Sequence, residues 1–106
     1  LYTISGTPNP NEIKFMLRKA MEGDMEGARK ILWGLLFDRG TSPEDIFSQC
    51  HRAVTELIKD GKIVAKVLDK LAEYEFRVVE GASPVVQIEA FLAQIFAIAS
   101  DSDATL

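Results

Sequence analysis

The stretch SPEDIFSQCHRAVTELI, residues 42–58, decides the fold because it contains a complete helix signal in one segment. Ser42 is a preferred N-cap residue, Pro43 suits the first helical turn, and Asp45 follows three residues after the cap. Apolar residues then recur every three or four positions, which is the spacing of one buried helix face. They are Ile46, Phe47, Cys50, Val54, Leu57 and Ile58. We therefore predict a helix that begins after Ser42 and ends at Asp60 and Gly61.

Four further segments carry the same kind of apolar stripe, and cap or stop residues bound them. The expected helices are residues 10–22, 24–38, 62–79 and 84–99. Asn9 and Ser83 are suited to cap the first and the last, and each is followed by a proline. The glycines expected to end helices are Gly23, Gly40, Gly61 and Gly81. With short connections and no convincing strand, the sequence predicts an all-α domain in which five helices form a bundle.

The two ends of the chain differ in composition from this helical centre. Residues 1–9 start with the short extended run LYTIS, and we expect them to be a linker from an upstream module. Residues 100–106 are mostly polar, and we expect them to form a flexible tail. Because the chain begins with Leu1 instead of Met, we expect it to be part of a longer protein. Residues 10–99 are the predicted helical domain.

Two of the expected helices carry more apolar surface than one small core can cover. In residues 24–38, Trp33 and Phe37 lie one turn apart and nearly opposite the core stripe, at about 100° per residue. In residues 84–99, apolar side chains surround almost the whole helix, and such a helix must be enclosed. We therefore expect a partner chain to cover part of this surface. The candidate interface residues are Trp33, Phe37, Phe91, Ile95 and Ile98.

Residues 84–99 and the end of residues 62–79 each raise one further question. Residues 84–99 are shorter than the roughly 20 residues of a membrane span and include Glu89, so we expect a buried or interfacial helix and no membrane partner. Near the end of residues 62–79, we expect Phe76 to join the core. Its neighbour Arg77 is expected to pair with Glu73 or Glu80 on the solvent-exposed face of the helix.

Composition favours an intracellular domain over a dedicated nucleic-acid binder. The formal net charge is −4, whereas a protein specialised for DNA usually carries a basic stripe. The single cysteine, Cys50, cannot form a disulfide within the chain, and this favours a reducing compartment. The second and third helices could be read as a DNA-binding helix-turn-helix, but they lack a surface rich in Arg, Asn or Gln.

The residues indicate no catalytic, cofactor or metal site in this chain. Neither a phosphate-binding loop nor a dinucleotide-binding glycine motif is present. Cys50 and His51 are adjacent, but neighbours on a helix point about 100° apart and do not face a common ligand. A second Cys or His that could complete a zinc site is missing from the sequence. We therefore expect a buried free cysteine beside a boundary histidine, in a domain that is not an enzyme.

Several motifs, in order, resemble the C-terminal region of replication factor C small subunits, which are AAA+ clamp loaders of the archaeal type. DIFSQCHRAV (45–54) resembles a segment ending in His-Arg-Glu-Ile, FRVVEGA (76–82) resembles Phe-Arg-Leu-Val-Glu-Gly-Ala, and QIEAFLA (87–93) resembles Gln-Leu-Glu-Ala-Leu-Leu-Ala. The residues that carry the resemblance include His51, Arg52, Phe76, Arg77, Glu80 and Gly81. Gly27 and Ala53 depart from it, because glutamate is common at both places in that family.

This resemblance implies a five-helix clamp-loader collar, in which the collars of five subunits pack into a ring. It implies ATP and magnesium in the full-length protein but no cofactor in this chain. The implied partners are other clamp-loader subunits, with the sliding clamp and primed DNA reached through the full complex in the cytoplasm or at the nucleoid. The alternative from the residues alone is a helical regulatory or DNA-binding module of another protein, which would bind DNA in a salt-sensitive way.

Overall fold

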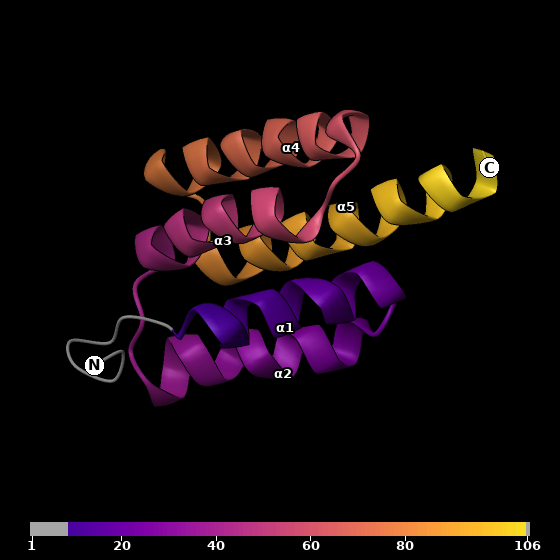
Figure 1. The fold of residues 1–106 in the computed structure, drawn as a ribbon. Helices are drawn as coiled ribbons and strands as arrows, with labels where there is room; N and C mark the ends of the chain where they lie inside the picture. The colour runs from indigo at the N-terminus through magenta and orange to yellow at the C-terminus, as the bar shows by residue number, and fades with distance from the viewer. Residues whose placement is uncertain (1–8, 106) are drawn as a thin grey trace.

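A computed structural model describes residues 9–105, which fold into five helices and contain no strand (Figure 1). The helices are α1 (Pro10–Glu22), α2 (Met25–Trp33) with its π-helical continuation η2 (Gly34–Asp38), α3 (Pro43–Leu57), α4 (Gly61–Val79) and α5 (Pro84–Thr105). The predicted all-α class is confirmed.

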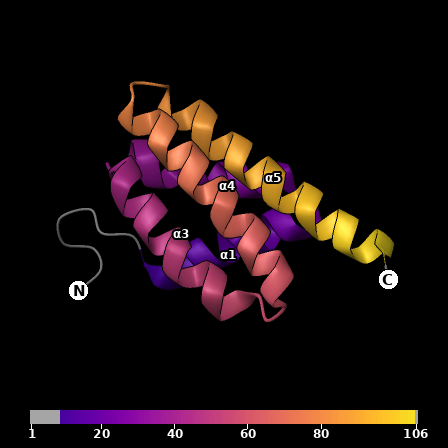
Figure 2. The ribbon, with the colours of Figure 1, turned by 90° about the horizontal axis from the view of Figure 1, so that it is seen from above.

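The helices lie in layers, with α2 at one side of the bundle and α4 at the other (Figure 1). α1 and α2 form one antiparallel pair, and α4 and α5 form a second that is visible from above (Figure 2). α1 packs against α2, α3 and α5, whereas α4 packs against α3 and α5. This order turns the outward faces of α2 and α4 away from the shared core and away from each other.

Side chains cap the first four helices where the sequence predicts helix starts or stops. The capping residues are Asn9, Asp24, Ser42 and Asp60. At α2, Asp24 Oδ1 accepts a hydrogen bond of 2.9 Å from the backbone N–H of Gly27. This bond is the main cause that lowers the pKa of Asp24 below its usual value. A Cβ at Gly27 would lie 2.6 Å from the Asp24 carboxylate, so glycine leaves room for this cap.

Three helix boundaries differ from those expected from the sequence. α3 ends at Leu57, because Ile58 adopts an extended conformation with φ −108° and ψ 125°. Asp60 does not end that helix but caps α4, which begins at Gly61. The α5 backbone continues past the expected end at residue 99 and remains helical to Thr105. Residues 1–8 of the expected linker lie outside the described residues.

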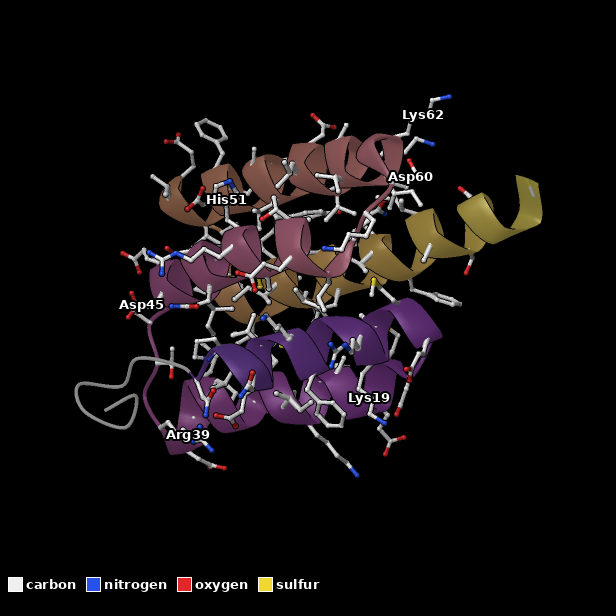
Figure 3. The ribbon with its side chains drawn as sticks, in the orientation of Figure 1. Lys19, Arg39, Asp45, His51, Asp60 and Lys62 are labelled. Carbon is white, nitrogen blue, oxygen red and sulfur yellow. The ribbon has the colours of Figure 1, made fainter. Side chains whose placement is uncertain are left out.

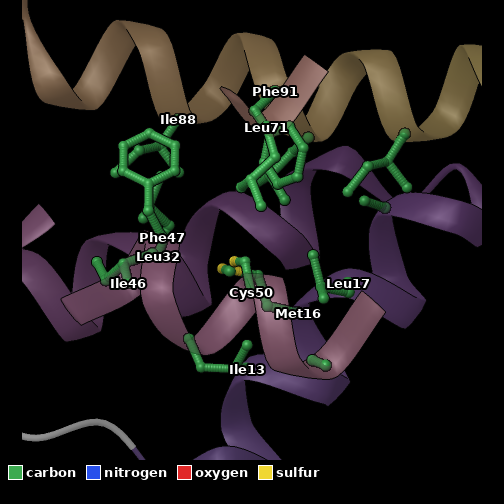
Figure 4. Packing of buried hydrophobic residues seen from close by; sticks show 14 of the residues in the cluster. Ile13, Met16, Leu17, Leu32, Ile46, Phe47, Cys50, Leu71, Ile88 and Phe91 are labelled. Carbon is green, nitrogen blue, oxygen red and sulfur yellow. The ribbon is translucent and has the colours of Figure 1, made fainter. Parts of the chain in front are cut away.

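All five helices contribute fully or almost fully buried side chains to one core (Figure 4). One such residue from each helix in turn is Ile13, Leu32, Phe47, Leu71 and Phe91. The ring centroid of Phe91 lies 6.4 Å from that of Phe47 and 6.5 Å from that of Tyr74. The chain therefore closes a core of its own from helices that are distant in sequence.

Candidate functional site

Trp33 and Phe37 form an exposed aromatic pair on the outward face of α2 and η2. Their side chains are 45% and 63% exposed, and their rings meet edge to face with centroids 5.8 Å apart. The pair belongs to an open surface groove, which we call the Trp33 surface. It is lined by Met25, Glu26, Arg29, Lys30, Trp33, Gly34, Phe37 and Asp38. Exposed aromatic residues of this size mark candidate sites of protein contact.

Glu89 of α5 holds the indole of the Trp33 surface in place. Trp33 Nε1 donates a hydrogen bond of 2.7 Å to Glu89 Oε2. Arg29 Nε lies 3.2 Å from the same carboxylate oxygen, and the Arg29 guanidinium lies over the Trp33 ring at 5.4 Å. The aromatic ring is thus fixed from two sides before any partner arrives, which reduces the entropy lost on binding.

The last part of the Trp33 surface lies on a π-helical turn that the sequence analysis did not anticipate. From Gly34 to Asp38 the backbone winds as a π-helix, and the N–H of Arg39 donates to the carbonyl of Gly34, five residues earlier. A side chain at Gly34 would find no close neighbour except Asp38, at 3.9 Å. Such turns are rare and occur often at functional sites. The glycine in mid-helix is the only sequence signal that could have suggested this turn.

Two of the five predicted interface residues lie in the core. Phe91 is 0% exposed and Ile95 is 2% exposed, so neither can contact another chain. The prediction is wrong for these two because α5 lies between α4 and α1, and both neighbours cover it. Ile98, one turn further along, is partly buried against the same core. Only Trp33 and Phe37 of the five are exposed.

The structure also exposes an apolar stripe on α4, and this stripe includes Phe76, which the sequence analysis assigned to the core. Phe76 is 63% exposed and Val79 is 70% exposed, so the expectation that Phe76 is a core residue is wrong. The buried side of α4 is formed by Val67, Leu71 and Tyr74. Counting about 100° per residue places Phe76 and Val79 on the other side. We call this outward row the α4 stripe; it comprises Ala65, Leu68, Ala72, Phe76 and Val79, of which Leu68 is half-buried and the others are exposed.

Residues 76–82 also form the end of α4. Gly81 has a φ of +109°, and its N–H donates to the carbonyl of Val78. The N–H of Ala82 donates to the carbonyl of Arg77, which completes a Schellman stop. The Arg77 side chain pairs with Glu73 at 2.5 Å, as expected. This motif therefore combines a helix stop with an exposed phenylalanine.

The adjacent Cys50 and His51 do not form a site. Cys50 is fully buried, and desolvation raises the pKa of its thiol to about 12, so it stays protonated at neutral pH. His51 and Arg52 are exposed on α3. His51 lies where α3 faces α4 (Figure 3). It lines a shallow groove that also includes Glu75. Within residues 9–101, no group of three or more Cys, His, Asp or Glu side chains could hold a metal ion.

The second departure from the family pattern, Ala53, has a structural reason. Ala53 is 3% exposed in the core on α3. A glutamate there would have to bury or displace its charge, at a high energetic cost. Nearby, Glu56 pairs with Lys14 of α1 at 2.5 Å, and this ion pair lowers the pKa of Glu56. This ion pair joins α1 to α3 at the surface, about one turn along α3 from the buried Ala53.

Helix α5 is the most apolar element of the fold. The segment Pro84–Asp101 is long and apolar enough to cross a membrane, judged by length and composition alone. Ile88, Phe91 and Leu92 of this segment are 0% exposed within the bundle, and Glu89 contacts α2. These three apolar side chains thus have partners within the chain, whereas Val86 is 59% exposed and Phe96 is 40% exposed.

Comparison with known proteins agrees with the resemblance seen in the sequence. The sequence model described as "Replication factor C C-terminal domain" matches residues 8–94. A protein of Methanoregula boonei named "Replication factor C small subunit" is 37% identical over 94 residues, which cover 89% of this chain and 29% of that protein. A protein of the same name from Halobacterium salinarum is 40% identical over 95 residues, which cover 90% of this chain and 30% of that protein. The chain thus spans less than a third of the length of these curated relatives.

Proposed function

The chain belongs to the family of replication factor C C-terminal domains, and on that premise we propose that it is the collar domain through which a clamp-loader small subunit assembles with its neighbours. On this proposal the domain, residues 10–99, is an oligomerisation module. The surface that assembles it is found among its exposed apolar side chains.

The observation that carries the proposal is the Trp33 surface on a domain whose core is already closed. Trp33 and Phe37 are not needed to fill the core, because each helix already contributes buried residues to it. Tryptophan is among the residues that contribute most to protein interfaces, and here its ring is held in place by Glu89. A fixed aromatic pair beside charged side chains has the composition of an interface centre with a polar rim.

The same proposal places the remaining chemistry elsewhere in the full-length protein. ATP and magnesium would bind the part of the protein that this chain does not include, and the domain itself would not be catalytic. Its direct partners would be other clamp-loader subunits, whereas the sliding clamp and primed DNA would be reached through the complex. This role requires an intracellular protein and no contact with a membrane.

Binding to purified clamp-loader subunits tests this function. The chain is immobilised and exposed to the large and small replication factor C subunits of the same source, and the dissociation constant is measured. We expect binding that Trp33→Glu weakens at least tenfold, since a charge would replace the ring at the interface centre (about 1.4 kcal/mol per tenfold change). The thermal midpoint should fall only modestly, because Trp33 is 45% exposed and the change removes its bond to Glu89 without opening the core.

The matched control is Phe15→Glu, which makes the same type of change at a 51% exposed aromatic on α1, outside the Trp33 surface. It should leave binding intact. The proposal fails if the folded chain binds no loader subunit. Salt-sensitive binding of the chain to DNA would then favour the alternative, a helical DNA-binding module.

A further inference from the structure

Two rows with exposed aromatic side chains lie on opposite sides of this chain, and the outer sides of these rings face away from the core. The first, which we call the α2 row, runs along α2 and η2 from the half-buried Met25 to the exposed Trp33 and Phe37. The second is the α4 stripe, which ends in Phe76 and Val79. Figure 1 places α2 and α4 at opposite sides of the bundle. Two copies of the chain could therefore join these rows without collision between their cores.

The two rows match in length. From Met25 to Phe37 the first spans about 18 Å at 1.5 Å per residue, and from Ala65 to Val79 the second spans about 21 Å. The sizes of their side chains are also complementary. The α2 row projects two large rings, whereas the α4 stripe is lined by the small side chains of Ala65 and Ala72 before Phe76. Small residues on one helix leave room for large residues of another, which is how helices pack ridges into grooves.

Along both rows, positive charges lie nearer the N-terminal end and negative charges lie nearer the C-terminal end. Beside the α2 row, Arg29 and Lys30 precede Asp38. Within the chain, Arg29 pairs with Glu89 at 3.2 Å and Lys30 pairs with Glu26 at 3.6 Å, and both cations remain exposed. Beside the α4 stripe, exposed Lys66 lies near the start, and exposed Glu75 and Glu80 lie near the end. Parallel packing would bring like charges together. Antiparallel packing would instead place Glu75 and Glu80 near Arg29 and Lys30, and Lys66 near Asp38.

From these observations we propose that the α2 row of one copy docks antiparallel on the α4 stripe of a second copy, a pairing that rests on the proposed assembly function and names its two faces. The contact is heterologous, because each copy uses a different face to meet each neighbour. The rings supply most of the buried area. The exposed charges contribute less to affinity and select the antiparallel direction.

Mixing two disabled variants tests this pairing by sedimentation velocity over a range of concentrations. Trp33→Glu removes the α2 row and leaves the α4 stripe intact, and Phe76→Glu does the reverse. We expect the unchanged chain to self-associate and each variant alone to stay monomeric. A mixture of the two should form a 1:1 dimer and nothing larger, because only one intact pair of faces remains. All substituted side chains are 45% exposed or more, and circular dichroism checks that each variant is folded.

The control is again Phe15→Glu, which should self-associate like the unchanged chain. Glu75→Lys should weaken self-association about threefold to fivefold, and pairing it with Lys30→Glu in the other copy should restore it. A mixture that stays monomeric, or single variants that still self-associate, would overturn the pairing. An unchanged chain that is monomeric at every concentration would also overturn it. The assembly function would survive either result if the chain still binds other loader subunits.

Discussion

Helix α5 and the outward face of α2 have the same apolar excess in sequence but different surroundings in the fold. α5 packs against α1, α2 and α4, so Phe91 and Ile95 are enclosed by the chain itself. α2 lies at the edge of the bundle, and Trp33 and Phe37 remain exposed. A high apolar content thus indicates that a helix must be buried against something. The position of the helix in the bundle determines whether other helices of the same chain bury it.

The largest expected effect is a difference in unfolding free energy between substitutions in these two regions. Phe91→Ala should lower the free energy of unfolding by about 3–5 kcal/mol, because it leaves a cavity between Phe47 and Tyr74. Phe37→Ala should change it by about 0.5 kcal/mol or less, since the ring is 63% exposed. Urea denaturation, monitored by circular dichroism, measures both at a protein concentration where the chain is monomeric.

Equal losses for the two variants would contradict the comparison. They would mean that Phe37 supports the fold as much as Phe91 does, and that the Trp33 surface is part of the core. A loss confined to Phe91→Ala would instead show that α2 keeps its aromatic residues for some purpose other than folding.

The fold could be predicted from the sequence because its signals are local. Asn9 with Pro10, and Ser42 with Pro43, mark helix starts that depend only on neighbouring residues, and Gly23 and Gly81 mark stops in the same way. The exposure of apolar residues could not be predicted, because it depends on which helices become neighbours. Phe76 and Phe91 both continue an apolar stripe in sequence, yet one faces outward and the other fills the core.

A second prediction concerns the contact between Phe96 of α5, which is 40% exposed, and the turn between α1 and α2. A Cβ at Gly23 would lie 2.9 Å from the Phe96 ring, so the turn between α1 and α2 covers part of this side. Gly23 and Gly81 both have positive φ, but a Cβ at Gly81 would meet nothing within 4 Å. Gly81→Ala should therefore cost about 1 kcal/mol of backbone strain, and Gly23→Ala about 2 kcal/mol, because the ring must also move.

Thermal or urea unfolding of the two alanine variants provides the comparison, and each serves as the control for the other. If both lose the same stability, the contact between Phe96 and the turn contributes nothing, and α5 is more open on this side than its neighbours suggest. Restoring space in the double variant Gly23→Ala with Phe96→Leu should recover part of the loss.

The candidate site was only half predictable for a related reason. The spacing of Trp33 and Phe37 placed them opposite the core stripe, and that part follows from helix geometry alone. Their partner Glu89 lies 56 residues away in sequence from Trp33, so no local pattern could reveal the hydrogen bond. The π-helical turn after Trp33 likewise has no local sequence signal apart from Gly34.

The smallest expected effect concerns the hydrogen bond between Trp33 and Glu89, which joins α2 to α5. Trp33 is the single tryptophan, so its fluorescence anisotropy reports on the ring directly. Glu89→Ala should lower the anisotropy and cost about 0.5–1 kcal/mol of stability, since it removes the acceptor for the indole and the partner of Arg29. Glu89→Gln keeps an acceptor oxygen but loses the charge, so it should preserve the anisotropy. If Glu89→Ala leaves the ring as rigid as before, the aromatic surface of α2 is held by its own helix and not by α5.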